Sequence, residues 1–182
     1  GGYCLTKDPL LASWAKQTLF ESTAPLGQSE KGVQINDKMP LYAFQFLQKE
    51  FEGELAGKNA LLLGVSYRGD VGDTRYSPVE PFYEYLKKAG CQIDLCDPYV
   101  PYWEEQDVEI PSDYQGLITN KLDLIAFTAG HSQYKENADL IAEIMQLDKV
   151  MIYDTIGILT NEEIAKLNSK HTVRVVGRGD IK

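Results

Sequence analysis

The chain has 182 residues, a length that suits one domain with an appendage rather than two full domains. Its net charge of −9 argues against a nucleic-acid-binding surface, because contacts to nucleic-acid phosphates require a basic face. No apolar run approaches the roughly 20 residues that a membrane-spanning helix needs, and no signal-peptide pattern is present. We therefore expect a globular protein without a nucleic-acid or membrane partner.

The first nine residues, GGYCLTKDP, predict a glycine-led loop that runs into a helix. Asp8 stands where an N-cap is expected, and Pro9 suits the first helical position. Cys4 would then lie just before a helix N-terminus with Lys7 nearby, and both features favour the nucleophilic thiolate. The alternative is that Cys4 is a small buried apolar residue and that Asp8 is only a cap.

Residues 29–51 form the longest helical candidate, with a broad apolar side that includes Val33, Met39, Leu41, Phe44, Leu47 and Phe51. A helix this long and apolar needs more cover than one side of a small sheet provides. The pattern would fit a helix that joins two domains or that packs against its copy in a dimer. Pro40 should kink it or start a second segment. Asn36 is either a cap or a polar group aimed at a neighbouring site.

From residue 58 onward, strands and helices alternate. The expected strands are 60–65, 91–96, 122–128, 150–153 and 172–176, and the expected helices are 79–89, 112–119, 137–147 and one capped by Thr160 with Glu163. This alternation predicts an α/β fold with a doubly wound, mostly parallel Rossmann-like sheet, preceded by a helical segment with a long linking helix. We place the domain boundary between residues 1–53 and 54–182.

The cysteines and the aromatic loop give weaker signals. Three cysteines, without the spacing of metal ligands, indicate reduced thiols in a cytoplasmic protein and no metal site. Cys91 and Cys96, five positions apart in one predicted strand, should point to opposite faces as packing residues. The aromatic residues Tyr99, Tyr102 and Trp103 could stack on a base, but aromatic side chains more often serve packing.

The arginines mark the predicted ligand site. The chain has only four, and Arg68 and Arg75 lie in the loop after the first strand, while Arg178 follows the last strand. In a parallel sheet these loops share the carboxyl edge, where ligands bind. A guanidinium fork matches phosphate oxygens, so the arginines predict an anion site for a phosphate-bearing ligand at this edge. The alternative is that the arginines form salt bridges with Asp70, Asp73 and Asp180.

The two histidines have less specific surroundings. His131 follows the third strand on the same edge and could be a donor to a ligand or merely a turn residue. His171 precedes a strand and reads as a surface residue. No GxGxxG follows the first strand, so the dinucleotide-binding fingerprint is missing there.

Two motifs together resemble one family. GGYCLTKDP resembles the active-site segment of the nucleotide-sugar dehydrogenases, the UDP-glucose/GDP-mannose dehydrogenase family. Tyr67-Arg68 with residues 72–78, GDTRYSP, is similar to the C-terminal-domain signature of that family. Ile35-Asn36-Asp37 and Gly130-His131-Ser132 extend the likeness. It covers essentially the whole chain but only the back part of the family's polypeptide.

The resemblance implies a chemistry for the first segment. The family oxidises the C6 alcohol of a nucleotide-linked sugar to a carboxylate in two NAD-dependent steps. Cys4 would be the nucleophile that holds the sugar as a thiohemiacetal and then as a thioester. Asp8 would orient or activate the hydrolytic water. Thr6 stands where the family usually has proline, so the loop is less rigid here.

The resemblance also implies the binding residues and the partners. A UDP-sugar, either UDP-glucose or a UDP-N-acetylhexosamine, would contact Gly1, Gly2, Tyr3, Tyr67, Arg68 and Arg178, with Lys7, Asn36, Arg75 and His131 as further candidates. The family commonly has lysine where Arg68 stands. Residues 1–53 would be the cysteine loop and a remnant of the central dimerisation domain, and 54–182 the C-terminal UDP-sugar-binding domain. The long helix would form a homodimer.

Two other functions fit the sequence. The chain could be a stand-alone nucleotide- or phosphosugar-binding module whose Cys4 is incidental. It could also be a dimerisation domain without catalysis, in which the long helix is the essential element.

NAD should be bound by an N-terminal domain that this chain lacks. We therefore predict that the isolated chain does not oxidise a sugar. The measurement is absorbance of NADH after the purified chain is mixed with NAD and UDP-sugars. Accumulation of NADH would refute the prediction.

Overall fold

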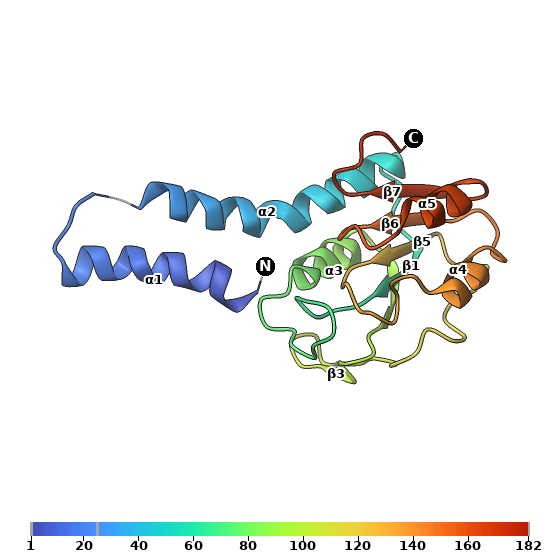
Figure 1. Ribbon diagram of the computed structural model, residues 1–182, viewed down its shortest axis with the longest axis horizontal. Coiled ribbons are helices and arrows are strands. Elements are labelled where there is room, and N and C mark those ends of the chain that lie inside the picture. Colours follow the sequence, from blue (N-terminus) through green and yellow to red (C-terminus); the bar gives the residue numbers. More distant parts are fainter. Residues whose placement is uncertain (1, 25, 182) are drawn as a thin grey trace.

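The computed structural model describes residues 2–24 and 26–181 and, at position 3, the backbone only. A helical hairpin projects from a compact α/β domain (Figure 1). Helix α1 (Tyr3–Leu19) leads away from the domain, and α2 (Gly27–Glu50) returns to it. Among the described residues, no helix is both long and apolar enough to cross a membrane.

The hairpin differs from the sequence prediction at both helices. Helix α1 begins at Tyr3 with Gly2 as its N-cap residue, and Pro9 lies inside it. The prediction that Asp8 caps this helix is therefore wrong, because helical residues already begin at Tyr3, directly after Gly2, whose positive φ of 87° is not helical. Helix α2 continues through Pro40 as one element, so no second segment begins there.

The α/β domain is built on a parallel sheet of five strands in the order β2-β1-β5-β6-β7. The strands are β1 (Asn59–Leu63), β2 (Gln92–Cys96), β5 (Leu124–Phe127), β6 (Met151–Asp154) and β7 (Thr172–Val175). The helices are α3 (Val79–Lys88), α4 (Ala138–Ile144) and α5 (Asn161–Asn168). The doubly wound α/β fold is thus confirmed.

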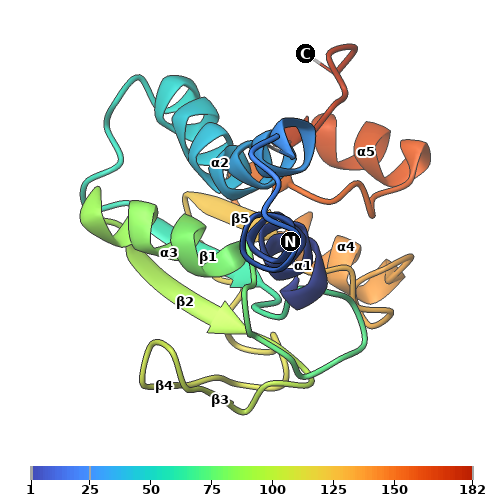
Figure 2. The same cartoon turned by 90° about the vertical axis from the view of Figure 1, so that its left-hand side faces the viewer.

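Helices cover both faces of this sheet (Figure 2). One core joins α2 and α3 to the face that carries Leu62 and Ala126, and the other joins α4 and α5 to the face that carries Ile125 and Val173. Because both faces are covered, the central strands are apolar throughout, which is why they could be predicted from short apolar runs. Thr160 and Glu163 form the predicted capping box of α5.

Two local predictions are wrong, for residues 112–119 and for His171, and one is confirmed. Residues 112–119 form turns instead of a helix. The aromatic loop contains a hairpin of β3 (Tyr102–Trp103) and β4 (Val108–Glu109). His171 is buried, and its Nδ1 accepts the N–H of Val150 at 3.4 Å. Cys91 and Cys96 contact opposite cores, as predicted.

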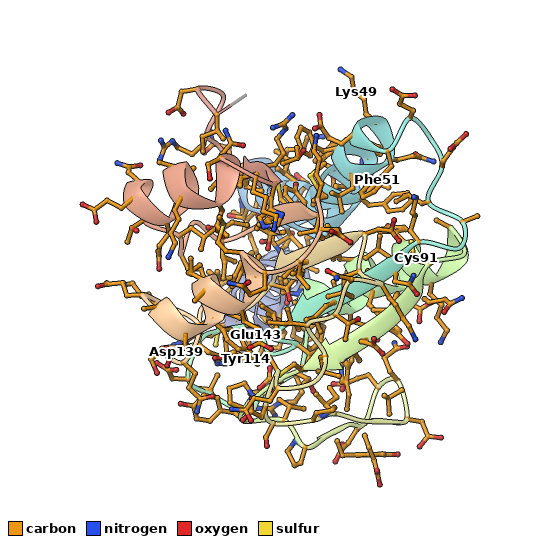
Figure 3. All side chains as sticks on the ribbon, turned by 90° about the vertical axis from the view of Figure 1, so that its right-hand side faces the viewer. Lys49, Phe51, Cys91, Tyr114, Asp139 and Glu143 are labelled. Atoms are coloured by element: carbon orange, nitrogen blue, oxygen red, sulfur yellow. The ribbon has the colours of Figure 1, made fainter. Side chains whose placement is uncertain are left out.

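The strands run toward the edge from which the hairpin projects. Figure 3 looks onto the opposite, amino-terminal edge, where Lys49 and Phe51 mark the end of α2 and Cys91 precedes β2. Since α2 ends at this amino edge and β1 runs back, the start of α1 and the loops after the strands share the carboxyl edge (Figures 1 and 2).

Two glycines let the loop after β1 lie directly against the loop after β5. Gly64 has a φ of 99°, and a Cβ placed on it would lie 2.3 Å from the Cβ of Ala129. A Cβ on Gly69 would lie 2.1 Å from the carbonyl oxygen of Gly130. Any larger residue at either position would force the loops apart, so these glycines fix the path of the chain toward residues 67 and 68.

The buried carboxylate of Asp97, directly after β2, holds these loops together. Its Oδ2 accepts the N–H of Val65 at 2.7 Å and lies 3.1 Å from Nε2 of His131, while its Oδ1 accepts the N–H of Tyr99 at 2.9 Å. Nδ1 of His131 accepts the N–H of Asp70 at 2.9 Å. The ring proton therefore belongs on Nε2, where it is donated to Asp97.

The environment of Asp97 favours its charged form. Burial alone would raise the pKa of this carboxyl group, but the hydrogen bonds from His131, Val65 and Tyr99 outweigh burial and lower the pKa below its usual value. Because the folded-state pKa is the lower one, the carboxylate stabilises the fold above the unfolded pKa. That contribution is lost as pH falls through the folded pKa.

Replacing Asp97 with asparagine should destabilise the domain by roughly 2–4 kcal/mol, because an amide turns its NH₂ toward N–H donors that then lack an acceptor. Denaturant unfolding at pH 7 measures this. Asp94→Asn, an exposed position on the same strand, is the control. The wild-type chain should also lose stability below about pH 4, and the Asp97 variant should lack that part of the loss. Equal stability of the Asp94 and Asp97 variants would contradict the prediction.

Candidate functional site

The candidate site lies at the carboxyl edge, where the start of α1 meets the loop between β1 and α3. The N–H of Gly2 donates to the carbonyl oxygen of Tyr76 at 3.3 Å. A Cβ on Gly2 would lie 2.9 Å from the ring of Tyr67. The cysteine-bearing segment therefore lies directly on the loop that carries Tyr67 and Arg68.

Cys4 is the second residue of α1 and is exposed. It lies inside the helix, whereas the sequence predicted a position just before it. The alternative of a buried apolar cysteine does not hold. Asp8 lies four residues further along α1, so both side chains project from the same face of the helix. Nζ of Lys7 lies 3.2 Å from Oδ1 of Asp8, so its charge is paired with that carboxylate.

Two of the three edge arginines are paired with carboxylates. Arg75 binds Asp73 through Nε and Nη2 at 2.9 and 2.7 Å. Arg178 binds Asp180 through the corresponding atoms, both at 2.8 Å, and its hydrogen bonds lower the pKa of Asp180 to about 2. The salt-bridge alternative therefore describes Arg75 and Arg178 as they stand in the structure.

Arg68 has different surroundings. Its side chain is exposed, and it has no carboxylate within salt-bridge distance among the residues that the structure describes. The neighbouring Asp70 instead accepts the N–H and hydroxyl of Ser132 at 2.8 and 3.0 Å. Arg68 and Arg178 share the carboxyl edge, but β5 and β6 separate the strands that they follow. Arg68 is thus an exposed edge arginine that directly follows Tyr67, the residue whose ring lies against Gly2.

His131 supports the loops instead of reaching into open space. It is fully buried, and both ring nitrogens are engaged, one by Asp70 and the other by Asp97. The hydroxyl of Ser66 approaches the same Nε2 at 3.2 Å. A catalytic triad needs serine and aspartate on different ring nitrogens, so this cluster is structural. The expectation of a ligand donor at His131 does not fit its contacts.

Asn36 lies in the middle of α2, so it is not a cap. It borders a groove of about 200 Å³ that Thr6 and Tyr76 also line, next to the start of α1. It also borders a second groove of about 250 Å³ with Thr128 and Thr155. Its position agrees with the alternative of a polar group near the site. Gly1 and the side chain of Tyr3, both predicted to contact the ligand, lie outside the described residues.

Sequence reasoning missed Ser66 and Asp97 as the residues that hold the site loops. An aspartate directly after a predicted strand, followed by Pro98, was a visible signal for a polar role at the carboxyl edge. Nothing in the sequence indicated that its partners would be Val65 and His131, because those contacts depend on which strands are neighbours.

Comparisons with known proteins identify the family of the chain. Residues 61–161 match the UDP binding domain of the UDP-glucose/GDP-mannose dehydrogenase family. The UDP-N-acetyl-D-mannosamine dehydrogenase of Methanocaldococcus jannaschii is 29% identical over 182 residues, which cover 98% of this chain and 39% of that protein. The UDP-N-acetyl-D-glucosamine 6-dehydrogenase of Salmonella typhi is 25% identical, with 90% of this chain and 38% of that protein covered.

A solved structure has the same fold. The NDP-N-acetyl-D-galactosaminuronic acid dehydrogenase of Methanosarcina mazei superimposes with a TM-score of 0.82 at 24% identity and covers 97% of this chain and 38% of that one. The chain thus spans less than two fifths of the length of these relatives. The matched segment is more than half of the chain, and the chain belongs to the UDP-glucose/GDP-mannose dehydrogenase family.

Proposed function

We propose that this chain binds a UDP-sugar at the carboxyl edge of its sheet and presents Cys4 to C6 of the sugar, as part of an NAD-dependent nucleotide-sugar dehydrogenase. The observation that carries the proposal is the packing of Gly2 on Tyr67 and Tyr76. It brings a helix start with an exposed thiol beside the loop with an exposed arginine. A nucleotide diphosphate and a sugar carbon are the two ends of one ligand that such an arrangement could hold.

The chain's own residues supply the covalent part of the chemistry. The Cys4 thiolate adds to a C6 aldehyde to give a thiohemiacetal, and a thioester formed from it is hydrolysed by water to the carboxylate. Asp8, one helical turn from Cys4, orients that water. The exposure of Cys4 and the shared helix face support these roles.

NAD is the hydride acceptor of the proposed reaction, and the residues of this chain do not fit it. The loop after β1 lacks the glycine pattern for a pyrophosphate, and Gly69 in that loop is packed against Gly130. The NAD site therefore belongs to another part of the longer enzyme, and we derive no hydride step from this chain.

Arg68 supplies the charge for the diphosphate in this proposal, with Gly1, Gly2, Tyr3 and Tyr67 along the ligand. Arg178 contributes only if it exchanges Asp180 for a phosphate oxygen, since its fork is occupied. Among sugars, we propose a UDP-N-acetylhexosamine over UDP-glucose, because the relatives from M. jannaschii and S. typhi are named for such sugars.

We also propose a homodimer through α2. The side chains of Ile35, Met39 and Tyr42 on this helix are about half exposed, although they are large and apolar. Exposed apolar patches on a projecting helix favour association. A copy of the chain packed along α2 would cover them.

Arg68→Ala should weaken UDP binding roughly 10- to 150-fold, or about 1.5–3 kcal/mol, because a charge-assisted hydrogen bond is lost. Isothermal titration calorimetry with UDP measures this. Lys121→Ala, which removes one exposed positive charge before β5 at the amino edge, is the matched control and should bind UDP as the wild type does. Unchanged affinity of the Arg68 variant would remove this residue from the site.

Sedimentation velocity tests the dimer. The wild-type chain should sediment as a dimer at micromolar concentration, and Met39→Asp should shift it toward the monomer, because a charge would be buried in the interface. Gln45→Asp, at an exposed and already polar position of the same helix, is the control. A wild-type chain that sediments as a monomer would contradict the proposal.

A further inference from the structure

The ring of Tyr67 lies against the backbone of the cysteine-bearing segment. Gly2 is buried, and its φ of 87° is one that glycine adopts without strain. A Cβ there would meet Cδ2 and Cε2 of Tyr67 at 2.9 and 3.0 Å. The contact is therefore one that only glycine permits without a shift of the ring.

The loop on which Gly2 sits is closed on itself. The N–H of Tyr67 donates to the carbonyl oxygen of Asp73 at 3.1 Å, and the N–H of Ser77 donates to that of Thr74 at 2.9 Å. Gly2 contacts the loop near both ends, at the ring of Tyr67 and at the carbonyl oxygen of Tyr76. A displacement at either end of the loop is thus transmitted to the same residue of the cysteine-bearing segment.

Only one residue separates Gly2 from Cys4, and the first turn of α1 is tied to it. The hydroxyl of Thr6 donates to the carbonyl oxygen of Gly2 at 3.2 Å. The position of the thiol relative to Arg68 is therefore set through Gly2. The loop end at Arg68 is in turn held by the hydroxyl of Ser66, which donates to the carbonyl oxygen of Arg68 at 3.2 Å.

We infer that Tyr67 is a positioning residue that locks the cysteine-bearing segment onto the anion-binding loop, so that a diphosphate bound at Arg68 changes the reactivity of the Cys4 thiol. The inference rests on the proposed function, because it requires the diphosphate to bind at this loop. It adds a role in coupling the two ends of the ligand to Tyr67 and Gly2, which the proposed function also places along the ligand.

The chain contains its own reference thiols for a test. Burial raises the pKa of Cys91 and raises that of Cys96 to about 11, so both should alkylate slowly and independently of UDP. Cys4 is exposed. Peptide mass spectrometry after timed treatment with iodoacetamide reports each thiol separately, and calorimetry on the same samples gives the affinity for UDP.

In the wild-type chain, saturating UDP should slow alkylation of Cys4 roughly three- to tenfold, because a nearby anion disfavours the thiolate, and uridine should have no such effect. Gly2→Ala should abolish this slowing when UDP is saturating for the variant. Gly57→Ala is the matched control, because Gly57 also has a positive φ, 77°, but no atom within 4 Å of an added Cβ. It should behave as the wild type does.

Tyr67→Phe, which keeps the ring, should retain the slowing, and Tyr67→Ala should lose it at saturating UDP. Slow alkylation of Cys96 in every variant verifies that the fold is intact. UDP that binds but leaves Cys4 unaffected in the wild type overturns the inference and leaves the proposed function standing, as does full slowing in Gly2→Ala. No binding of UDP by the wild-type chain overturns both.

Discussion

The arrangement at the carboxyl edge depends on one buried carboxylate. Asp97 collects N–H groups from the loops after β1 and β2 and the ring of His131 from the loop after β5. A charge without solvent is costly unless each lone pair finds a donor, and here the donors come from three separate loops. The same hydrogen bonds that offset burial therefore fix the loops relative to one another, and with them the backbone that leads to Tyr67 and Arg68.

Because the molecule is negatively charged, an anion site on it requires individually positioned groups. A protein with a net charge of −9 has no general attraction for a diphosphate, so any anion site must be made by individual groups. Two guanidinium forks at the edge are already matched by Asp73 and Asp180, which limits the positive charge available to a ligand. Asp70, two positions after Arg68 in the sequence, accepts hydrogen bonds from Ser132 instead of forming an ion pair with Arg68. The hydrogen bonds of Asp70 thus affect the proposed site indirectly, because they leave the charge of Arg68 available to a ligand.

The strands and their order along the chain could be predicted because burial on both faces leaves short apolar runs, such as residues 60–65, bounded by turn residues. The capping box of Thr160 and Glu163 could also be predicted, because it depends only on residues three positions apart in the sequence. The start of α1 could not be predicted, because Asp8-Pro9 is a good helix start in isolation. Only the contacts of Gly2 with Tyr67 and Tyr76 favour the observed start at Tyr3. The burial of His131 and His171 could not be predicted for the same reason, because it depends on residues more than twenty positions away in the sequence. Cys4 and Arg68 stay predictions, and they could be made because the chemistry of a thiol and of a guanidinium group, rather than packing, singles them out.

The hairpin explains why the two halves of the proposed ligand site can lie far apart in the sequence. Helix α1 leads away from the domain and α2 returns to it, so the segment from residue 2 to residue 58 begins and ends at opposite edges of one small sheet. Such an excursion costs little loop entropy when it is made of rigid helices, but it leaves the start of α1 attached to the domain only through its own contacts. Those contacts include the hydrogen bond to Tyr76 and the packing on Tyr67. Gly2 permits the close approach that fixes the start of α1 on this loop. The position of the Cys4 thiol is fixed with it, because α1 begins at the residue after Gly2.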